Sequence, residues 1–197
     1  MSKTIAEEIY NKGFHIIDNF LDETSFANLR ETAEQRLSGG DFRQAKVGKQ
    51  SGAAHHFDIR KDSICWLDED ENDAALCVYF SKIRELAQTL NRALFLGLVD
   101  FETHFAVYQP GSFYKKHVDQ FTNTQNRRIS CVYYLNAHWQ ESFAGQLKLY
   151  DCEDQLLAQV LPEANRFICF RSELPHEVSE TLNTRYSIAG WMKTRSI

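Results

Sequence analysis

The spacing of apolar residues changes from helical to strand-like about halfway along the chain. Before residue 100, apolar residues recur every three or four positions in three segments, at 3–12, from Asp22 to Gly39, and at 76–94. Each segment predicts an amphipathic helix, and Asp22 is a suitable N-cap for the second. The third is the most regular, because one stripe contains Leu76, Phe80, Ile83, Ala87, Leu90 and Leu94. Such a stripe needs a broad apolar surface to cover, most simply one face of a sheet.

From residue 101 onward the apolar pattern has a period of two, which is typical of strands. Strands are expected at 101–108, 128–135, 145–150, 166–170 and 184–192, and the apolar run 14–17 predicts one earlier strand. No helix-length segment lies between the later strands, which excludes a parallel βαβ layout. Helices followed by short antiparallel strands predict an α+β fold, a jelly-roll-like pair of sheets with helices packed outside one of them.

The segment between the second and third helices is expected to carry a loop and a small finger. Residues 38–56 are polar and rich in Gly, Ser and Ala, which predicts a mobile loop. Residues 57–60 and 63–66 predict two short strands around a Lys-Asp turn. No repeat or Pro/Ser-rich linker divides the chain, so 1–197 is expected to be one domain. In it, 1–100 provides helical support, loop and finger, and 101–192 provides the sheet core.

Composition narrows the class of protein. A formal net charge of -5 and the absence of a Lys/Arg-rich block argue against nucleic-acid binding. The five cysteines form no CxxC pair, and several lie within apolar runs, which predicts buried free thiols in a reducing compartment. The first residues are polar and acidic, unlike a signal peptide, and no apolar run approaches the length of a membrane span. A cytoplasmic protein without nucleic-acid or membrane partners is expected.

The clearest chemical signal is the sequence His117-x-Asp119. Two residues that are two positions apart on an extended backbone project to the same face. A second imidazole from another strand, His176, would complete a set of two histidines and one carboxylate that leaves open positions on Fe(II). Arg185, nine positions after His176, could hold the far carboxylate of an acidic co-substrate. These four residues predict an iron oxygenase.

A second pair with the same spacing, His56-x-Asp58, competes with the first. It lies at the end of the Gly/Ser/Ala-rich loop with no strand before it, a poor place to hold ligands rigidly. The pair at His117 follows a strand and a Pro-Gly turn, and His176 follows the apolar run 167–170. The context therefore favours His117, Asp119 and His176.

Face parity gives a second argument for the site. Arg128 and Tyr134 share one face of their strand, and Arg185 and Trp191 share one face of the last strand. If both faces line one barrel, Arg185 and Tyr134 can meet at a buried carboxylate, with Arg128 and Trp191 nearer the mouth. The alternative for Arg185 is a structural salt bridge to one of the chain's own acids.

At these residues the sequence resembles the Fe(II)- and 2-oxoglutarate-dependent oxygenases. More narrowly, it is similar to the prolyl hydroxylase domain enzymes, the group that includes the hypoxia-sensing hydroxylases and their bacterial relatives. The matching motifs are Tyr108-x-Pro110-Gly111, Tyr114-x-x-His117-Val118-Asp119, Arg128-x-x-Cys131-Val132-Tyr133-Tyr134-Leu135-Asn136, Gly145-x-Leu147-x-Leu149, Pro175-His176-Glu177-Val178 and Arg185-Tyr186-x-Ile188-x-x-Trp191. Upstream, Arg60-x-Asp62-x-Ile64-x-Trp66 resembles the finger that covers substrate in that group.

The resemblance implies a double-stranded β-helix and a role for each matching residue. His117, Asp119 and His176 would be the catalytic iron ligands. The co-substrate 2-oxoglutarate would be bound by Arg185 and Tyr134 at its distal carboxylate and by Tyr108 near the metal. The substrate would be contacted by Arg128, Trp191 and Tyr114.

The implied reaction is hydroxylation of an exposed prolyl residue in a protein or peptide, consuming O2 and 2-oxoglutarate and releasing succinate and CO2. Two alternatives stay open at this point. The same oxygenase chemistry could act on a free amino acid or small molecule. The barrel could also be a non-enzymatic, cupin-like module that binds a metal or another ligand.

Overall fold

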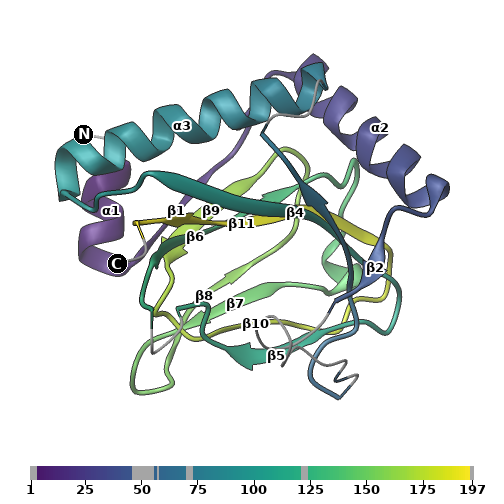
Figure 1. Ribbon diagram of the computed structural model, residues 1–197. Helices are drawn as coiled ribbons and strands as arrows, with labels where there is room; N and C mark the ends of the chain where they lie inside the picture. The colour runs from purple at the N-terminus through teal and green to yellow at the C-terminus, as the bar shows by residue number, and fades with distance from the viewer. Residues whose placement is uncertain (1–3, 46–55, 57, 70–72, 121–123, 196–197) are drawn as a thin grey trace.

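The fold is a pair of antiparallel sheets with three helices on the outer side of the larger one (Figure 1). The computed structural model describes residues 4–45, 56, 58–69, 73–120 and 124–195. The larger sheet has seven strands in the order β1-β9-β6-β11-β4-β3-β2, and the smaller has four in the order β5-β10-β7-β8. The two sheets confirm the jelly-roll-like, double-stranded β-helix prediction.

The elements follow one another in the expected order, helices mostly first. The helices are α1 (Ile5–Lys12), α2 (Glu23–Gly39), α3 (Ala74–Leu94) and the short 3-10 helix η2 (Glu141–Phe143). The strands are β1 (Phe14–Ile17), β2 (Arg43–Gln44), β3 (Ser63–Leu67), β4 (Asp100–Tyr108), β5 (Tyr114–His117), β6 (Arg127–Tyr134), β7 (Leu147–Tyr150), β8 (Leu156–Val160), β9 (Phe167–Arg171), β10 (His176–Val178) and β11 (Arg185–Lys193).

Side-chain caps fix where the helices begin. Thr4 and Glu7 form a capping box at the start of α1, and Asp22 accepts a hydrogen bond from the backbone N–H of Ser25 at the start of α2. Asp73 accepts from two backbone N–H groups of α3 in the same way. Gly13 ends α1 in the left-handed conformation (φ 86°), which glycine adopts without steric cost, and the chain then enters β1 directly.

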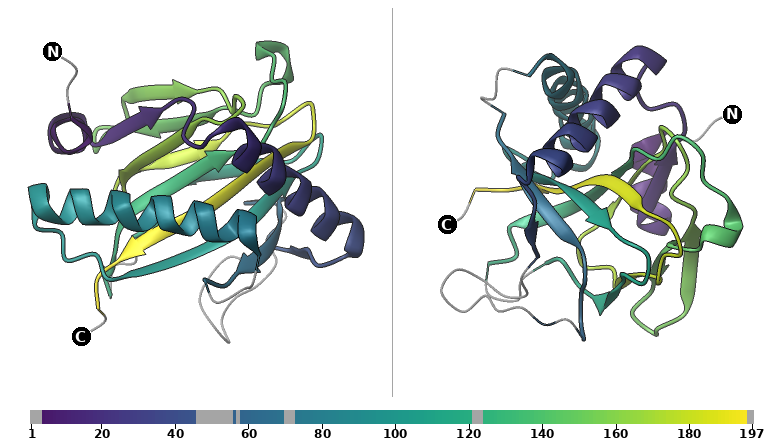
Figure 2. Two further views of the ribbon diagram at one scale, coloured as in Figure 1. Left: turned by 90° about the horizontal axis from the view of Figure 1, so that it is seen from above. Right: turned by 90° about the vertical axis from the view of Figure 1, so that its right-hand side faces the viewer.

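The main hydrophobic core lies between the helices and the larger sheet. The predicted stripe of α3 is buried against this sheet, and α3 crosses its strands on the outer face (Figure 2). Tyr79 of α3 stacks on Tyr133 of β6 with ring centroids 5.8 Å apart, while Phe80 meets Phe101 at 6.2 Å. These contacts cover the outer face of β4, β6 and β11. The inner face of the larger sheet is therefore left to line a cavity.

The region from residue 38 to 67 is arranged differently from the prediction. Arg43–Gln44 forms β2 and pairs with β3 at Ile64 and Ser63, so part of the expected loop is a strand; residues 46–55 lie outside the described residues. A strand was expected at 57–60, and this prediction is wrong for the described residues 58–60. Arg60 makes only an isolated bridge to Tyr114, because this segment crosses to the smaller sheet instead of turning back on β3.

Two further features complete the fold. The strand β8 at the edge of the smaller sheet was not predicted, because its sequence, Leu-Leu-Ala-Gln-Val, does not alternate. No helix within the described ranges is long and apolar enough to span a membrane.

Candidate active site

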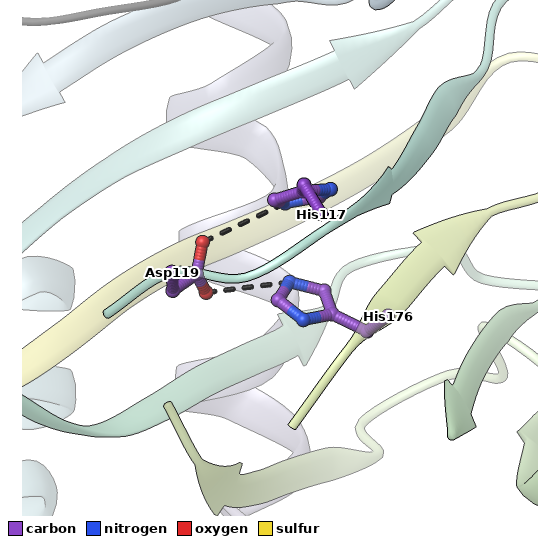
Figure 3. Close-up of side chains that lie close together, drawn as sticks. All are labelled: His117, Asp119 and His176. Carbon is purple, nitrogen blue, oxygen red and sulfur yellow. Dashed lines mark ion pairs between the residues drawn. The ribbon is translucent and has the colours of Figure 1, made fainter. Parts of the chain in front are cut away.

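Strand pairing in the smaller sheet brings two imidazoles and one carboxylate together. His117 is the last residue of β5 and His176 the first of β10, and these two residues are direct partners across the antiparallel pair. Their rings lie 4.2 Å apart between centroids. Asp119 follows β5 by two residues, with its carboxylate oxygens 3.6 Å from Nε2 of His117 and 3.3 Å from Nε2 of His176 (Figure 3).

Hydrogen bonds to the backbone orient both imidazoles. Nδ1 of His117 lies 2.8 Å from the carbonyl oxygen of Lys115, and Nδ1 of His176 lies 2.9 Å from that of Leu174. Since a carbonyl only accepts, each Nδ1 carries the proton and donates it. Nε2 of each ring is therefore the nitrogen left for a metal ion, and both Nε2 atoms face Asp119. Ser130 donates from its hydroxyl to Asp119 at 2.7 Å and fixes the carboxylate as well.

The electrostatics of this group suit a bound cation. Burial raises the pKa of the Asp119 carboxyl, but the charge of His176 and hydrogen bonds from both histidines outweigh it and hold the pKa well below its usual range. Burial lowers the pKa of His117. Burial also acts against a charged His176, but Asp119 reverses this and raises its pKa in the metal-free protein. A metal ion would therefore take the place of a proton at His176.

The three side chains fit Fe(II) by their chemistry. Their ligand atoms all lie within 4.8 Å of one another, and they supply two imidazole nitrogens and one carboxylate oxygen. Within the described part of the chain, no other group of three such residues is close enough to hold a metal. The competing residues His56 and Asp58 are both exposed and belong to no such group.

A buried arginine lies in the same cavity. The side chain of Arg185 is only 1% exposed, and its Nε has no hydrogen-bond partner. Its guanidinium carbon lies 4.9 Å from the ring centroid of Tyr108 and 5.0 Å from that of Tyr134, whose hydroxyl also has no partner. One nitrogen contacts the hydroxyl of Ser187 at 3.3 Å. Among the described residues, Arg185 pairs with no acid, contrary to the salt-bridge alternative, so this group fits a bound carboxylate.

The cavity has a volume of about 880 Å³, and aromatic rings line its opening. Trp66 of β3 is 52% exposed, and its ring lies 5.0 Å from that of His104 on β4. Trp191 of β11 lies 5.5 Å from His104 and 6.5 Å from Trp66, so the three rings form one cluster. The guanidinium of Arg127 lies 3.5 Å from the Trp191 ring and contacts Glu102 at 3.2 Å.

The parity argument selected the wrong member of the Arg127–Arg128 pair. Arg127 lines the cavity, whereas Arg128 lines a different hollow beside Ile9. The cause is a β-bulge in β6: Met192 pairs with Ile129 and Lys193 with Arg127, which leaves Arg128 without a partner on β11. The extra residue reverses the alternation at the start of the strand. The other predicted residues (Tyr108, Tyr114, Tyr134, Arg185 and Trp191) lie at the cavity or directly beside it.

His104 was not predicted, although the alternation of β4 indicates it. Counting back from Tyr108 in steps of two places Ala106, His104 and Glu102 on the cavity face, and all three line it. His104 is 3% exposed and its Nδ1 has no hydrogen-bond partner. Burial, assisted by the positive charge of Arg60, lowers its pKa to about 3, so the ring is neutral at pH 7.

This buried imidazole should make the fold sensitive to acid. A histidine with a lowered pKa in the folded state stabilises the protein fully above its unfolded value near 6.5, and this contribution is lost as pH falls below it. Between pH 7 and pH 5 the metal-free wild type should lose about 2 kcal/mol of unfolding free energy more than His104→Phe. Urea denaturation at the two pH values measures this difference, and equal losses would contradict the assignment.

Comparisons with known proteins agree with this geometry. Residues 103–193 match the model of the 2OG-Fe(II) oxygenase superfamily. Human prolyl hydroxylase EGLN3 is 28% identical over 190 residues, which cover 93% of this chain and 79% of that protein. The human Egl nine homolog 1 is 27% identical over 186 residues, covering 91% of this chain and 43% of the relative.

Two solved structures share this fold over nearly the whole chain. A Pseudomonas putida prolyl-4-hydroxylase superposes with a TM-score of 0.86 at 32% sequence identity, and the match covers 97% of both chains. A Trichoplax adhaerens prolyl hydroxylase, in complex with a peptide fragment of the hypoxia inducible factor oxygen degradation domain, has a TM-score of 0.87 at 26% identity. That match covers 96% of this chain and 87% of the other.

Sequence similarity across nearly the whole chain thus coincides with a largely buried His-Asp-His group and a buried arginine that pairs with no acid among the described residues. The chain belongs to the Fe(II)- and 2-oxoglutarate-dependent oxygenase superfamily and is an enzyme of its prolyl hydroxylase group.

Proposed function

We propose that the protein hydroxylates a prolyl residue, at C4, within a protein or peptide substrate. The observation that carries this proposal is the cavity itself: it opens beside exposed Trp66 and contains both the His-Asp-His group and Arg185. An opening of this kind admits one side chain of an extended peptide. Similarity to a prolyl-4-hydroxylase over the full chain supports proline as that side chain.

Different residues of the cavity would bind the iron and the co-substrate. His117, Asp119 and His176 would hold Fe(II), which together with 2-oxoglutarate and O2 supplies the oxidation of a C–H bond and leaves succinate and CO2. Arg185 would fork onto the distal carboxylate of 2-oxoglutarate. The unpartnered hydroxyl of Tyr134 would donate a further hydrogen bond to it.

Tyr108 completes the co-substrate end of the cavity. Its ring lies against the Arg185 guanidinium, and burial raises the pKa of its hydroxyl, so Tyr108 remains a neutral donor at every working pH. A neutral phenol adds no charge that would repel 2-oxoglutarate. Together with Ala106 and Leu147, which also line the cavity, its ring would help to exclude water from the reacting centre.

The peptide would lie against the aromatic opening. Trp191 offers a flat apolar surface, and Arg127 stacks on that ring while one of its terminal nitrogens donates to Glu102. Tyr114 lies next to His117 and lines the same space, so its hydroxyl would contact the substrate close to the iron. Trp191 and Tyr114 thus remain the proposed substrate contacts. Arg127 replaces Arg128 as the third.

Peptide hydroxylation under isotopically labelled O2 tests the function. The enzyme with Fe(II) and 2-oxoglutarate is incubated with synthetic peptides that each contain one proline, and with matched peptides that contain alanine instead. One labelled oxygen in a proline peptide, recovered as 4-hydroxyproline, is the expected result. Succinate release stimulated by free amino acids, with no labelled peptide, would favour the small-molecule alternative.

The bulge in β6 leads to a prediction about substrate affinity. Arg127→Met should raise KM for a peptide substrate about tenfold with kcat changed little, because Arg127 lines the opening rather than the reacting centre. Arg128→Met, with the same change of side chain on the other face, should leave KM within about twofold of wild type. Initial rates at varied peptide concentration give KM for both variants. A raised KM in Arg128→Met and an unchanged KM in Arg127→Met would identify Arg128 as the substrate contact instead.

We also propose that the enzyme works in the cytoplasm. All five cysteines are free thiols, and the exposed ones, Cys77 and Cys152, would be vulnerable to oxidation in a secretory compartment.

A further inference from the structure

The imidazole of His117 belongs to a stack of three side chains. The ring of Tyr114 lies parallel to it, with centroids 3.6 Å apart and an interplanar angle of 15°. The guanidinium carbon of Arg60 lies 4.2 Å from the centroid of the same Tyr114 ring. Arg60 is in turn held by Asp62, with Nε and a terminal nitrogen donating to the two carboxylate oxygens at 2.7 Å and 2.5 Å.

The ion pair at the end of this stack is unusually well buried. Asp62 is completely inaccessible to solvent, and the Arg60 side chain is only 12% exposed. Withdrawing two charges from water costs free energy that their attraction often only offsets, so a buried pair adds little to stability compared with apolar residues of similar size. Its rigid two-point geometry does fix the position of the guanidinium. The pair is therefore suited to positioning Tyr114 rather than to stabilising the fold.

His117 needs such support because of where it lies in the fold. It lies on β5, the edge strand of the smaller sheet, which has a partner strand, β10, on one side only. On the other side the backbone of β5 meets the segment before β3. The N–H of Lys115 donates to the carbonyl of Ile59 at 2.9 Å, and that of Lys61 donates to the carbonyl of Phe113 at 3.1 Å.

An irregularity in β5 makes the stack possible. Tyr114 and His117 are three positions apart, so in a regular strand they would face opposite sides. Their partners in β10, Val178 and His176, are only two positions apart, and this shift in register turns both side chains into the cavity. Bulges of this kind re-aim side chains next to active sites.

We propose that Arg60 and Asp62 are positioning residues for the metal centre: through Tyr114 they hold the His117 imidazole with Nε2 facing Asp119. The inference rests on the proposed iron site but not on the identity of the substrate. Arg60 lines the cavity, and it reaches the His117 imidazole through Tyr114. The segment that leads into β3 thereby becomes part of the iron site.

Iron affinity measures the effect directly, without any substrate. Anaerobic titration of the metal-free protein with Fe(II) should give a dissociation constant about tenfold higher for Arg60→Met and for Asp62→Asn, in line with the roughly 10–100-fold losses caused by changes around metal ligands. Arg60→Lys keeps the positive charge but cannot donate two parallel hydrogen bonds to Asp62. Its dissociation constant for Fe(II) should lie between those of wild type and Arg60→Met. The charge-transfer band that forms on adding 2-oxoglutarate should also shift or weaken in Arg60→Met.

A pair of variants at Tyr114 separates the ring from its hydroxyl. Tyr114→Phe keeps the stacked ring and should bind Fe(II) within about twofold of wild type, whereas Tyr114→Leu should resemble Arg60→Met. Arg84→Met serves as the matched control, because Arg84 pairs with Glu69 on the exposed side of α3 and lies outside the cavity. It should leave the iron affinity unchanged.

Two results would overturn the proposal. One is wild-type iron affinity in a natively folded Arg60→Met. The other is equal affinity in Tyr114→Leu and Tyr114→Phe, and this comparison decides alone if the Arg60 variant fails to fold. Neither depends on hydroxylation, so an enzyme that modified no prolyl peptide would leave this test intact.

Discussion

His117→Ala should bind Fe(II) more weakly than any other variant considered above and should lose all measurable hydroxylation. The substitution removes one of the two imidazoles and leaves only Asp119 and His176 of the three grouped ligand residues. The loss of affinity should exceed the roughly 10–100-fold typical of changes around a ligand, because a metal–nitrogen bond itself is lost. Anaerobic titration with Fe(II) and then 2-oxoglutarate should show no charge-transfer band.

The control for this variant is His56→Ala. His56 begins the second His-x-Asp pair of the sequence but is exposed and belongs to no group of ligand residues. Its variant should keep the band and an iron affinity within about twofold of wild type. A band retained in His117→Ala and abolished in His56→Ala would move the metal centre to the other pair.

Arg185→Met should lose affinity for 2-oxoglutarate and yet fold at least as stably as wild type. Loss of a buried, charge-assisted contact costs about 2 kcal/mol or more, which corresponds to an affinity at least about 30-fold weaker. Without co-substrate, however, the guanidinium is a buried charge that pairs with no acid of the described residues, and its Nε is unsatisfied. Replacing it with an apolar side chain of similar length removes that cost.

Two measurements check whether Arg185→Met binds 2-oxoglutarate more weakly while its stability is kept or raised. Isothermal titration of the metal-loaded protein gives the affinity for 2-oxoglutarate, and urea denaturation without co-substrate gives the unfolding free energy. Arg166→Met is the matched control, because Arg166 pairs with Asp18 at 2.6 Å and with Glu163 at 3.0 Å. It should lose stability and keep its co-substrate affinity. An Arg185→Met protein destabilised by more than about 2 kcal/mol would identify Arg185 as a structural residue.

The sequence predicted the centre of the cavity well because regular strands obey a simple rule. Tyr134, Arg185 and Trp191 lie in undistorted parts of β6 and β11, where alternation alone assigns each side chain to a face. Arg128 lies at a bulge, and no pattern of apolar residues marks the extra position. The bulged β5 escaped notice for the same reason, so the contact between Tyr114 and His117 was not foreseen.

The finger was harder to predict because its pairing is not local. Its strand β3 pairs with β4 and with the two-residue β2, which lies about twenty positions earlier in the chain. Short-range signals such as the Lys-Asp turn favour a hairpin with the preceding residues, but tertiary pairing overrides that preference. The buried pair of Arg60 and Asp62 was likewise invisible, since charged residues in a polar stretch look solvent-exposed.

The metal ligands come from β5, from the residue two positions after it and from β10, and this arrangement affects how much folded enzyme a cell contains. The two strands are joined by only a few backbone pairs, and an ion bound by His117, Asp119 and His176 would bridge them from the cavity side. Because an ion that binds only the folded chain adds RT ln(1 + [Fe]/Kd) to its stability, free iron at 100 times Kd contributes about 2.7 kcal/mol. The amount of folded enzyme, and not only its turnover, would then follow the iron supply.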